Sequence, residues 1–157
     1  MNRFDGGCEV LDQVNVDELV DWVSQISSST WPDWGKGPDR PAVVNDPEWE
    51  GLRERTETVV SELLKHFNGC HDTYRSITTI HPGDLVPYHC DTCHPGWVTR
   101  IHVPLMTNPY AWFITGGKRH HLEVGKAYQV NPGKPHSVVN SGKTTRIHLM
   151  FDVMNGD

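Results

Sequence analysis

The stretch PYHCDTCHPGWVTRIHVP, residues 87–104, gathers cysteine, histidine and aspartate side chains of the kinds that bind metal ions. Within it, His89 and Asp91 form an HxD pair. Residues two apart on a β-strand project to the same side, so this pair can aim an imidazole and a carboxylate into one cavity. His136, which follows the turn sequence NPGKP, is placed to supply a third ligand from another strand. Two histidines and one carboxylate leave three positions of an Fe(II) ion open, the arrangement of non-haem iron oxygenases.

The same stretch allows two other metal sites. Cys90, Cys93 and His94 spell CxxCH, the pattern of covalent haem attachment. Haem attachment requires export and usually a helical surround, whereas the N-terminus lacks an apolar leader and no helix is predicted after residue 72. Together with His89, these residues also offer thiolate and imidazole ligands that suit zinc. Structural zinc usually draws on two separated pairs of ligands, so we favour the iron site and keep zinc as an alternative.

An arginine downstream of His136 indicates an anionic ligand. In the last predicted strand, Arg146 shares one face with His148 and Met150. A buried guanidinium needs an anionic partner, and its planar fork suits a carboxylate, so a dicarboxylate co-substrate such as 2-oxoglutarate would satisfy it. By the same alternation, Arg100 and His102 lie together on one side of their strand. Two strands therefore present cationic or hydrogen-bonding residues to what we expect to be one pocket.

The elements that position these residues follow from the periodicity. Apolar residues recur at helical spacing in residues 15–28 and again in residues 46–69, where Asp46 is the predicted N-cap. Beyond residue 72 the period falls to two, and Gly- and Pro-rich turns separate short runs of β-forming residues. These runs predict strands at 73–80, 85–90, 97–106, 111–115, 119–124, 126–131, 136–140 and 144–153. The pattern indicates a mainly β fold, a double-stranded β-helix (jelly-roll, cupin-like) with the two N-terminal helices packed on its outside.

Length and composition limit the architecture and the partners. The 157 residues suit one core, so we expect a single domain, 1–157, with 1–72 as helical N-terminal support and 73–157 as the catalytic core. With 14 basic and 20 acidic residues the formal charge is −6, which disfavours nucleic acid and anionic membranes and leaves a small-molecule or peptide substrate. No apolar segment approaches the length of a leader peptide or membrane span, so we expect a cytoplasmic protein with reduced cysteines.

The order of these motifs resembles that of a known family. The HxD pair is followed by RIHVPLMTNP, a hairpin beginning at Trp112 and Phe113, LEVGKAYQVN, HSVVNSG and RIHLMFDV. Over roughly residues 73–153, this order is similar to that of the aspartyl/asparaginyl β-hydroxylase family of Fe(II)/2-oxoglutarate oxygenases. Its strongest elements are the order of the strands and the ten-residue interval from His136 to Arg146.

The resemblance implies a function and a set of roles. It implies a dioxygenase that uses Fe(II), 2-oxoglutarate and O2 to hydroxylate an unactivated C–H bond of an amino-acid side chain, with release of succinate and carbon dioxide. By the match, His89 and His136 are iron ligands and Arg146 binds the distal carboxylate of 2-oxoglutarate. His102, with Arg100 beside it, falls where the family contacts the other end of the co-substrate.

Two features depart from the family pattern. Founding members carry HxG, without the carboxylate ligand, whereas this chain has His89-Cys90-Asp91, as do the proline cis-hydroxylase relatives. The interval from His89 to His102 is also longer than in the founding type, which affects the loop 93–97. Two alternatives stay open: a cupin-like metal-binding module without turnover, and a metal-dependent dioxygenase or isomerase that uses no oxo acid. Arg146 discriminates between the favoured function and the module, because the module has no need for a buried cation opposite the metal.

Overall fold

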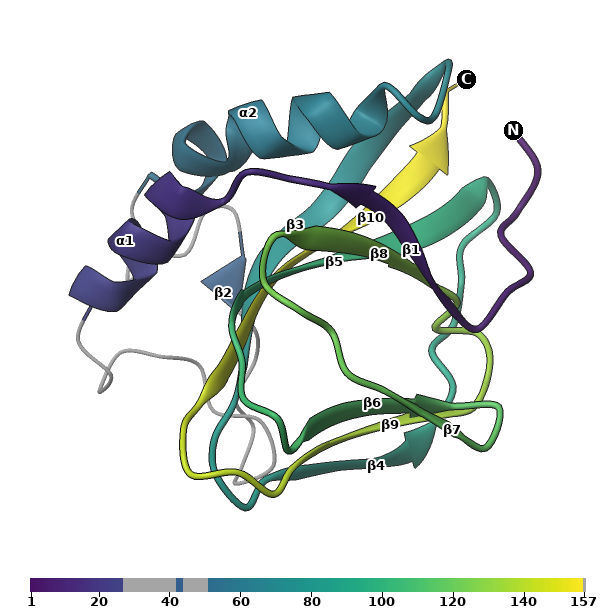
Figure 1. Ribbon diagram of the computed structural model, residues 1–157. Helices are drawn as coiled ribbons and strands as arrows, with labels where there is room; N and C mark the ends of the chain where they lie inside the picture. Colours follow the sequence, from purple (N-terminus) through teal and green to yellow (C-terminus); the bar gives the residue numbers. More distant parts are fainter. Residues whose placement is uncertain (27–41, 44–50, 157) are drawn as a thin grey trace.

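Two β-sheets lie face to face in the computed structural model, which describes residues 1–26, 42–43 and 51–156 (Figure 1). The two helices lie outside this pair of sheets. The elements are β1 (Cys8–Gln13), α1 (Asp17–Gln25), β2 (Ala42–Val43), α2 (Leu52–Leu64), β3 (Cys70–Ile80), β4 (Leu85–His89), β5 (Trp97–Met106), β6 (Ala111–Thr115), β7 (Lys118–His120), β8 (Lys126–Val130), β9 (His136–Asn140) and β10 (Arg146–Asn155).

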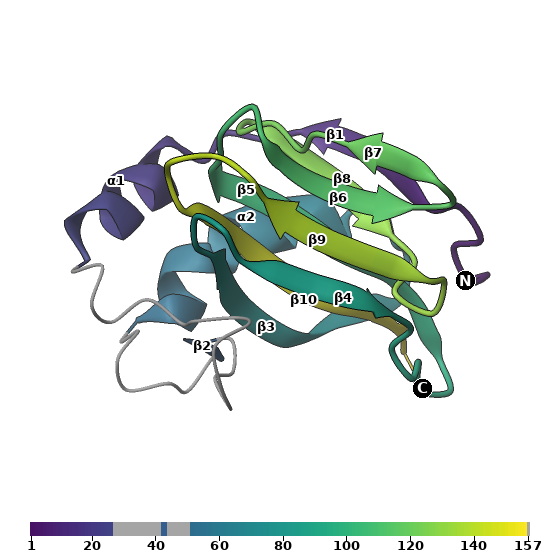
Figure 2. The same cartoon turned by 90° about the horizontal axis from the view of Figure 1, so that it is seen from below.

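The strands pair antiparallel within both sheets. The larger sheet has six strands in the order β1-β8-β5-β10-β3-β2, and the smaller has four in the order β4-β9-β6-β7. From β3 to β10 the chain passes back and forth between the two sheets, so consecutive segments wind around a common interior (Figure 2). This winding is a double-stranded β-helix, and it confirms the predicted fold class.

The helices cover the outer face of the larger sheet, opposite the smaller sheet (Figure 1). The apolar stripes of α1 and α2 are buried against residues of β3, β5 and β10, which alternate with residues that face the interior. On β10, Leu149 and Phe151 belong to this helix-facing core, while Arg146 and Met150 line the cavity between the sheets, as the alternation predicts. Neither described helix has the length and apolar character needed to cross a membrane.

The N-terminal part contributes more than helices. β1 pairs with β8, with Cys8 opposite Val130, and β3 begins at Cys70, so strands of the larger sheet also lie within the segment 1–72 that was expected to be helical support. The pairing of β1 depends on contacts more than a hundred residues apart in the chain, which local periodicity does not report. The predicted start of the second helix at Asp46 lies outside the described residues, and the predicted strand 119–124 is shortened to β7.

A β-bulge in β3 changes which side chains face the cavity. Between the pairs Met150–Ser76 and Asp152–Thr73, two residues of β3 oppose one residue of β10. Tyr74 in this bulge has a φ of 53°, in the left-handed region that bulky residues rarely adopt, and the residue lines the cavity. Arg75 turns the other way and is buried against α2. It donates to the carboxylates of Asp72 and Glu57 at 3.0 and 2.9 Å.

Because Tyr74 is held in a left-handed conformation, its replacement by glycine should destabilise the protein less than replacement of its neighbour Thr73 by glycine. Glycine adopts this conformation without the roughly 1–2 kcal/mol that a Cβ costs there. We expect Tyr74→Gly to lower the free energy of unfolding by about 1 kcal/mol less than Thr73→Gly, which replaces a residue beside the bulge that is also exposed. Urea denaturation of both variants measures this difference. Equal losses would show that the Tyr74 conformation stores no strain.

Candidate active site

His89, Asp91 and His136 come together at the facing ends of β4 and β9. His89 and His136 are opposite one another in the antiparallel register, and their ring centroids are 4.3 Å apart. Asp91 follows β4, where its backbone N–H donates to the carbonyl of Pro132 at 2.8 Å. One ligand atom from each of the three side chains lies within 4.8 Å of the others. The structure therefore brings together the three residues that the sequence predicted as metal ligands.

The hydrogen bonds of both imidazoles favour metal binding. Nδ1 of His89 is 2.7 Å from the carbonyl of Pro87, and Nδ1 of His136 is 2.9 Å from that of Lys134. A carbonyl accepts only, so each Nδ1 carries the proton and each Nε2 keeps its lone pair for a cation. Burial lowers the pKa of His136, which keeps that imidazole neutral at neutral pH. This donor set, two imidazoles and one carboxylate, fits Fe(II).

The zinc and haem alternatives gain no support from the geometry. Among the described residues, the potential ligand atoms that cluster with His89 are those of Asp91 and His136, and not those of Cys90, Cys93 or His94. Cys90 is exposed. Burial raises the pKa of the Cys93 thiol, so the free thiol is protonated at neutral pH.

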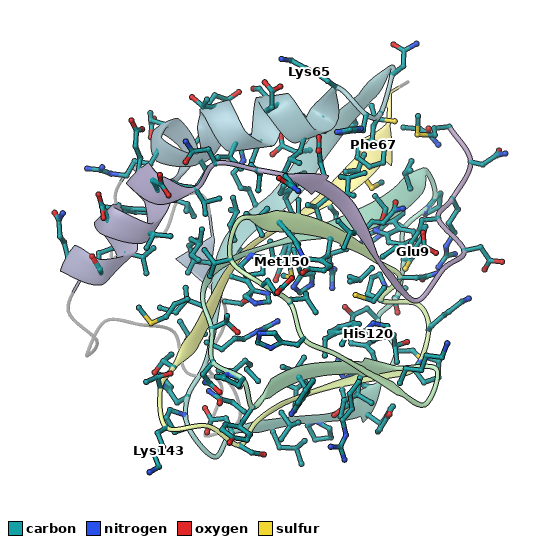
Figure 3. The ribbon with its side chains drawn as sticks, viewed as in Figure 1. Glu9, Lys65, Phe67, His120, Lys143 and Met150 are labelled. Atoms are coloured by element: carbon teal, nitrogen blue, oxygen red, sulfur yellow. The ribbon has the colours of Figure 1, made fainter. Side chains whose placement is uncertain are left out.

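The metal-ligand group lines a cavity of about 780 Å³ between the two sheets. Figure 3 shows side chains of both sheets, Met150 among them, directed into the space between the sheets. The interior face of β10 forms one wall, with Arg146, Met150, Asp152 and Met154 along it. A strand rises about 3.3 Å per residue, so this wall spans about 25 Å and is long enough for two ligands side by side.

Arg146 supplies a buried cation at one end of this wall. Its side chain is buried, and Nη2 donates to Nδ1 of His148 at 2.8 Å. Within the described part of the chain it makes no ion pair, and burial alone lowers its pKa to about 9, so it is still cationic at neutral pH. A buried guanidinium without a carboxylate partner is costly, which indicates that an anionic ligand completes the site.

Two polar residues near Arg146 complete this end of the cavity. Burial lowers the pKa of His102 well below its usual range, and its Nδ1 is 3.2 Å from Nδ1 of His148. His102 lines the cavity, and its contact to the co-substrate stays a prediction. Thr78 on β3 also lines the cavity, and its buried hydroxyl has no hydrogen-bond partner among the described residues. The sequence analysis missed Thr78, although strand alternation in 73–80 could have placed it on the interior face.

Arg100 has protein partners that the sequence did not reveal. Its Nε and Nη2 donate to the two oxygens of Asp152 at 2.7 and 3.0 Å, and its Nη1 donates to Oδ2 of Asp91. All three guanidinium nitrogens are therefore engaged by carboxylates of the protein. The predicted contact of Arg100 to the co-substrate stays untested, and the geometry favours a role beside the metal ligands instead.

Comparison with solved structures shows which known proteins share this fold. The fold is similar to that of a viral collagen prolyl hydroxylase from Paramecium Bursaria Chlorella virus-1 in complex with 2-oxoglutarate, with a TM-score of 0.65, 11% identity and 98% of each chain covered. It is also similar to a Pseudomonas putida prolyl-4-hydroxylase, with a TM-score of 0.60, 14% identity and coverage of 96% of this chain and 92% of the other. A 2-oxoglutarate–Fe(II) oxygenase family oxidoreductase from Burkholderia pseudomallei has a TM-score of 0.59 at 13% identity, over 99% and 96% of the two chains. The fold is that of the Fe(II)/2-oxoglutarate oxygenases.

The sequence itself identifies the family within this class. The profile of the aspartyl/asparaginyl β-hydroxylase family matches residues 46–156, which is more than half of the chain. The chain therefore belongs to the aspartyl/asparaginyl β-hydroxylase family, and it is an enzyme of the oxygenase class. A search of curated proteins gave no match.

Proposed function

We propose that the protein is an Fe(II)/2-oxoglutarate-dependent dioxygenase that hydroxylates an unactivated C–H bond of an amino-acid side chain, in a peptide or a free amino acid. The observation that supports this most directly is that the metal-ligand group lines one cavity with Arg146, whose guanidinium makes no ion pair to the described residues. A divalent-ion site and a buried cation together match the two ends of a 2-oxo dicarboxylate.

Each end of the co-substrate has its own residues in this proposal. His89, Asp91 and His136 hold Fe(II), while Arg146 and the hydroxyl of Thr78 bind the distal carboxylate. When bound, iron and 2-oxoglutarate supply the chemistry by which one atom of O2 hydroxylates the substrate and the other enters succinate, with release of carbon dioxide. The protein binds and orients the reactants.

The apolar lining of the cavity has a separate task. Ile80, Phe113, Val130 and Val138 are buried and face the cavity from four different strands. They keep water from the space between the metal ligands and Arg146, which strengthens the charge interactions made there. In the proposal His102 faces the metal-binding end of the co-substrate as a neutral imidazole.

The cavity continues past the metal-ligand group to a region that we assign to the substrate. This region includes His71, Tyr74, Trp97 and Met154. Its aromatic and thioether groups suit an apolar or weakly polar side chain, and the prolyl hydroxylase structures among the neighbours lead us to include proline, free or within a peptide. Free thiols at the cysteines suit a reducing compartment, so we expect the enzyme to act in the cytoplasm.

Anaerobic addition of Fe(II) and then 2-oxoglutarate tests the proposal. Chelation of iron through the 2-oxo acid should produce a weak visible charge-transfer band, and the titration gives the affinity for the co-substrate. Succinate, which carries no oxo group, is the control and should produce no band. Iron binding without the band would favour a cupin-like metal-binding module, or an enzyme that uses no oxo acid, over the proposed function.

A further inference from the structure

Asp152, Arg100 and Asp91 form a chain of ion pairs that ends at the metal-ligand group. Asp152 on β10 is directly opposite Arg100 on β5 in the antiparallel register, so backbone pairing sets their separation. The side chains of both are largely buried, with 14% and 15% of their surface exposed. Neither residue is needed as a metal ligand, and the proposed function gives neither a role.

The hydrogen bonds assign a different task to each oxygen of Asp91. Asp152 occupies Nε and Nη2 of Arg100, which leaves Nη1 to reach Asp91. Nη1 binds Oδ2, while Oδ1 of Asp91 lies 3.1 Å from Nε2 of His89, among the atoms that would surround a cation. This geometry presents one carboxylate oxygen to the metal and holds the other.

The charges explain why the chain needs Asp152. A guanidinium beside Asp91 attracts the same carboxylate that a divalent cation requires, and it repels the cation. Two carboxylates, those of Asp152 and Asp91, pair with Arg100, so its guanidinium stays charged although it is largely buried. Asp152 offsets this charge and restrains the orientation of the guanidinium, so only one N–H reaches Asp91.

We propose that Asp152 is a positioning residue for the metal site: it holds and neutralises Arg100, so that Arg100 orients Asp91 as a one-oxygen ligand instead of competing with the metal for it. This inference rests on the proposed function, because it takes His89, Asp91 and His136 as the metal ligands. It gives Arg100 the role of orienting Asp91.

Mn(II) titration followed by electron paramagnetic resonance tests the proposal without turnover, because free and bound Mn(II) give different signals. In Asp152→Asn the guanidinium is left without its partner and draws Asp91 away, so we expect Mn(II) to bind about 10- to 100-fold more weakly. The double variant Arg100→Gln/Asp152→Asn removes the competing cation as well. It should bind Mn(II) more tightly than Asp152→Asn, although both carry the same change at residue 152.

Asp72 provides a matched control on the opposite face of the same sheet. Like Asp152 it pairs with a buried arginine, Arg75, and it is similarly buried at 12% exposure, but it faces α2 and not the cavity. Asp72→Asn should lower the melting temperature and leave the affinity for Mn(II) unchanged. The proposal is overturned if Asp152→Asn binds Mn(II) as tightly as wild type, or if the double variant binds as weakly as Asp152→Asn. Failure of wild type to bind Mn(II) or Fe(II) would instead refute the proposed function.

Discussion

Replacement of His136 by alanine is expected to abolish stoichiometric Fe(II) binding. The side chain is one of three that place a ligand atom within 4.8 Å of the others, and its loss leaves one imidazole and one carboxylate. Two protein ligands hold a divalent ion much less tightly than three, so the loss should exceed the roughly 10- to 100-fold that removal of an outer-sphere partner costs. Anaerobic equilibrium dialysis with Fe(II), followed by metal analysis of the protein, measures it.

His121 supplies the control for this experiment. Like His136 it belongs to the smaller-sheet region, but it is only partly buried, contacts Trp112 and the carbonyl of Ala111, and does not line the cavity. His121→Ala should bind Fe(II) like wild type, and circular dichroism should show that both variants are folded. Retention of one equivalent of iron by folded His136→Ala would rule out the assigned ligand set.

Replacement of Arg146 by methionine is expected to separate co-substrate binding from metal binding. Truncation of one partner of a buried charge pair typically costs about 2–5 kcal/mol, which corresponds to roughly 30-fold to several thousand-fold in affinity for 2-oxoglutarate. Iron binding should change little, because Arg146 is not among the clustered ligand atoms. Methionine keeps the buried volume and removes a charge that has no carboxylate partner in the described part of the chain, so the protein without ligand should be no less stable than wild type.

A 2-oxo acid without the distal carboxylate makes this experiment specific to Arg146. 2-Oxopentanoate can chelate iron but offers nothing for the guanidinium to bind, so wild type and Arg146→Met should bind it with similar affinity. The charge-transfer band reports both titrations. Equal weakening of 2-oxoglutarate and 2-oxopentanoate, or loss of iron together with 2-oxoglutarate, would contradict the role assigned to Arg146.

The fold class was predictable because its signals are local. Strand alternation in β10 separated Arg146 and Met150 from Leu149 and Phe151, and the structure confirms that the first pair faces the cavity and the second the helices. Burial on one face of a sheet imposes a period of two on the sequence itself, so the pattern is visible without coordinates. The turn residues between strands delimited most of them to within a few residues.

The candidate metal site was predictable for a similar reason. His89 and Asp91 are close in sequence, and His136 directly follows a turn, so it was predicted to begin a strand. Their residue types limit the metals that could bind to a small number, and only the proximity of the three side chains in the fold had to be assumed. In the structure, the β4–β9 register places His89 opposite His136 and so brings these side chains together.

Other features were decided by tertiary structure alone. Whether Arg100 faces a ligand or a protein carboxylate depends on Asp152, a residue 52 positions away whose place opposite Arg100 is set by the β5–β10 register. The bulge that turns Tyr74 toward the cavity and Arg75 toward α2 breaks the alternation on which strand reading relies. Likewise β1 joins the sheet by pairing with β8, which follows it by more than a hundred residues.

The amino-acid sequence by itself determined the residue types and their local alternation, and hence the sheets, the helices and the set of possible metal and anion ligands. The partner of each charged side chain was decided only by the folded chain. Local patterns follow from the geometry of neighbouring residues, whereas an ion pair depends on the distance between two side chains, and for residues far apart in sequence that distance exists only once the sheets have formed.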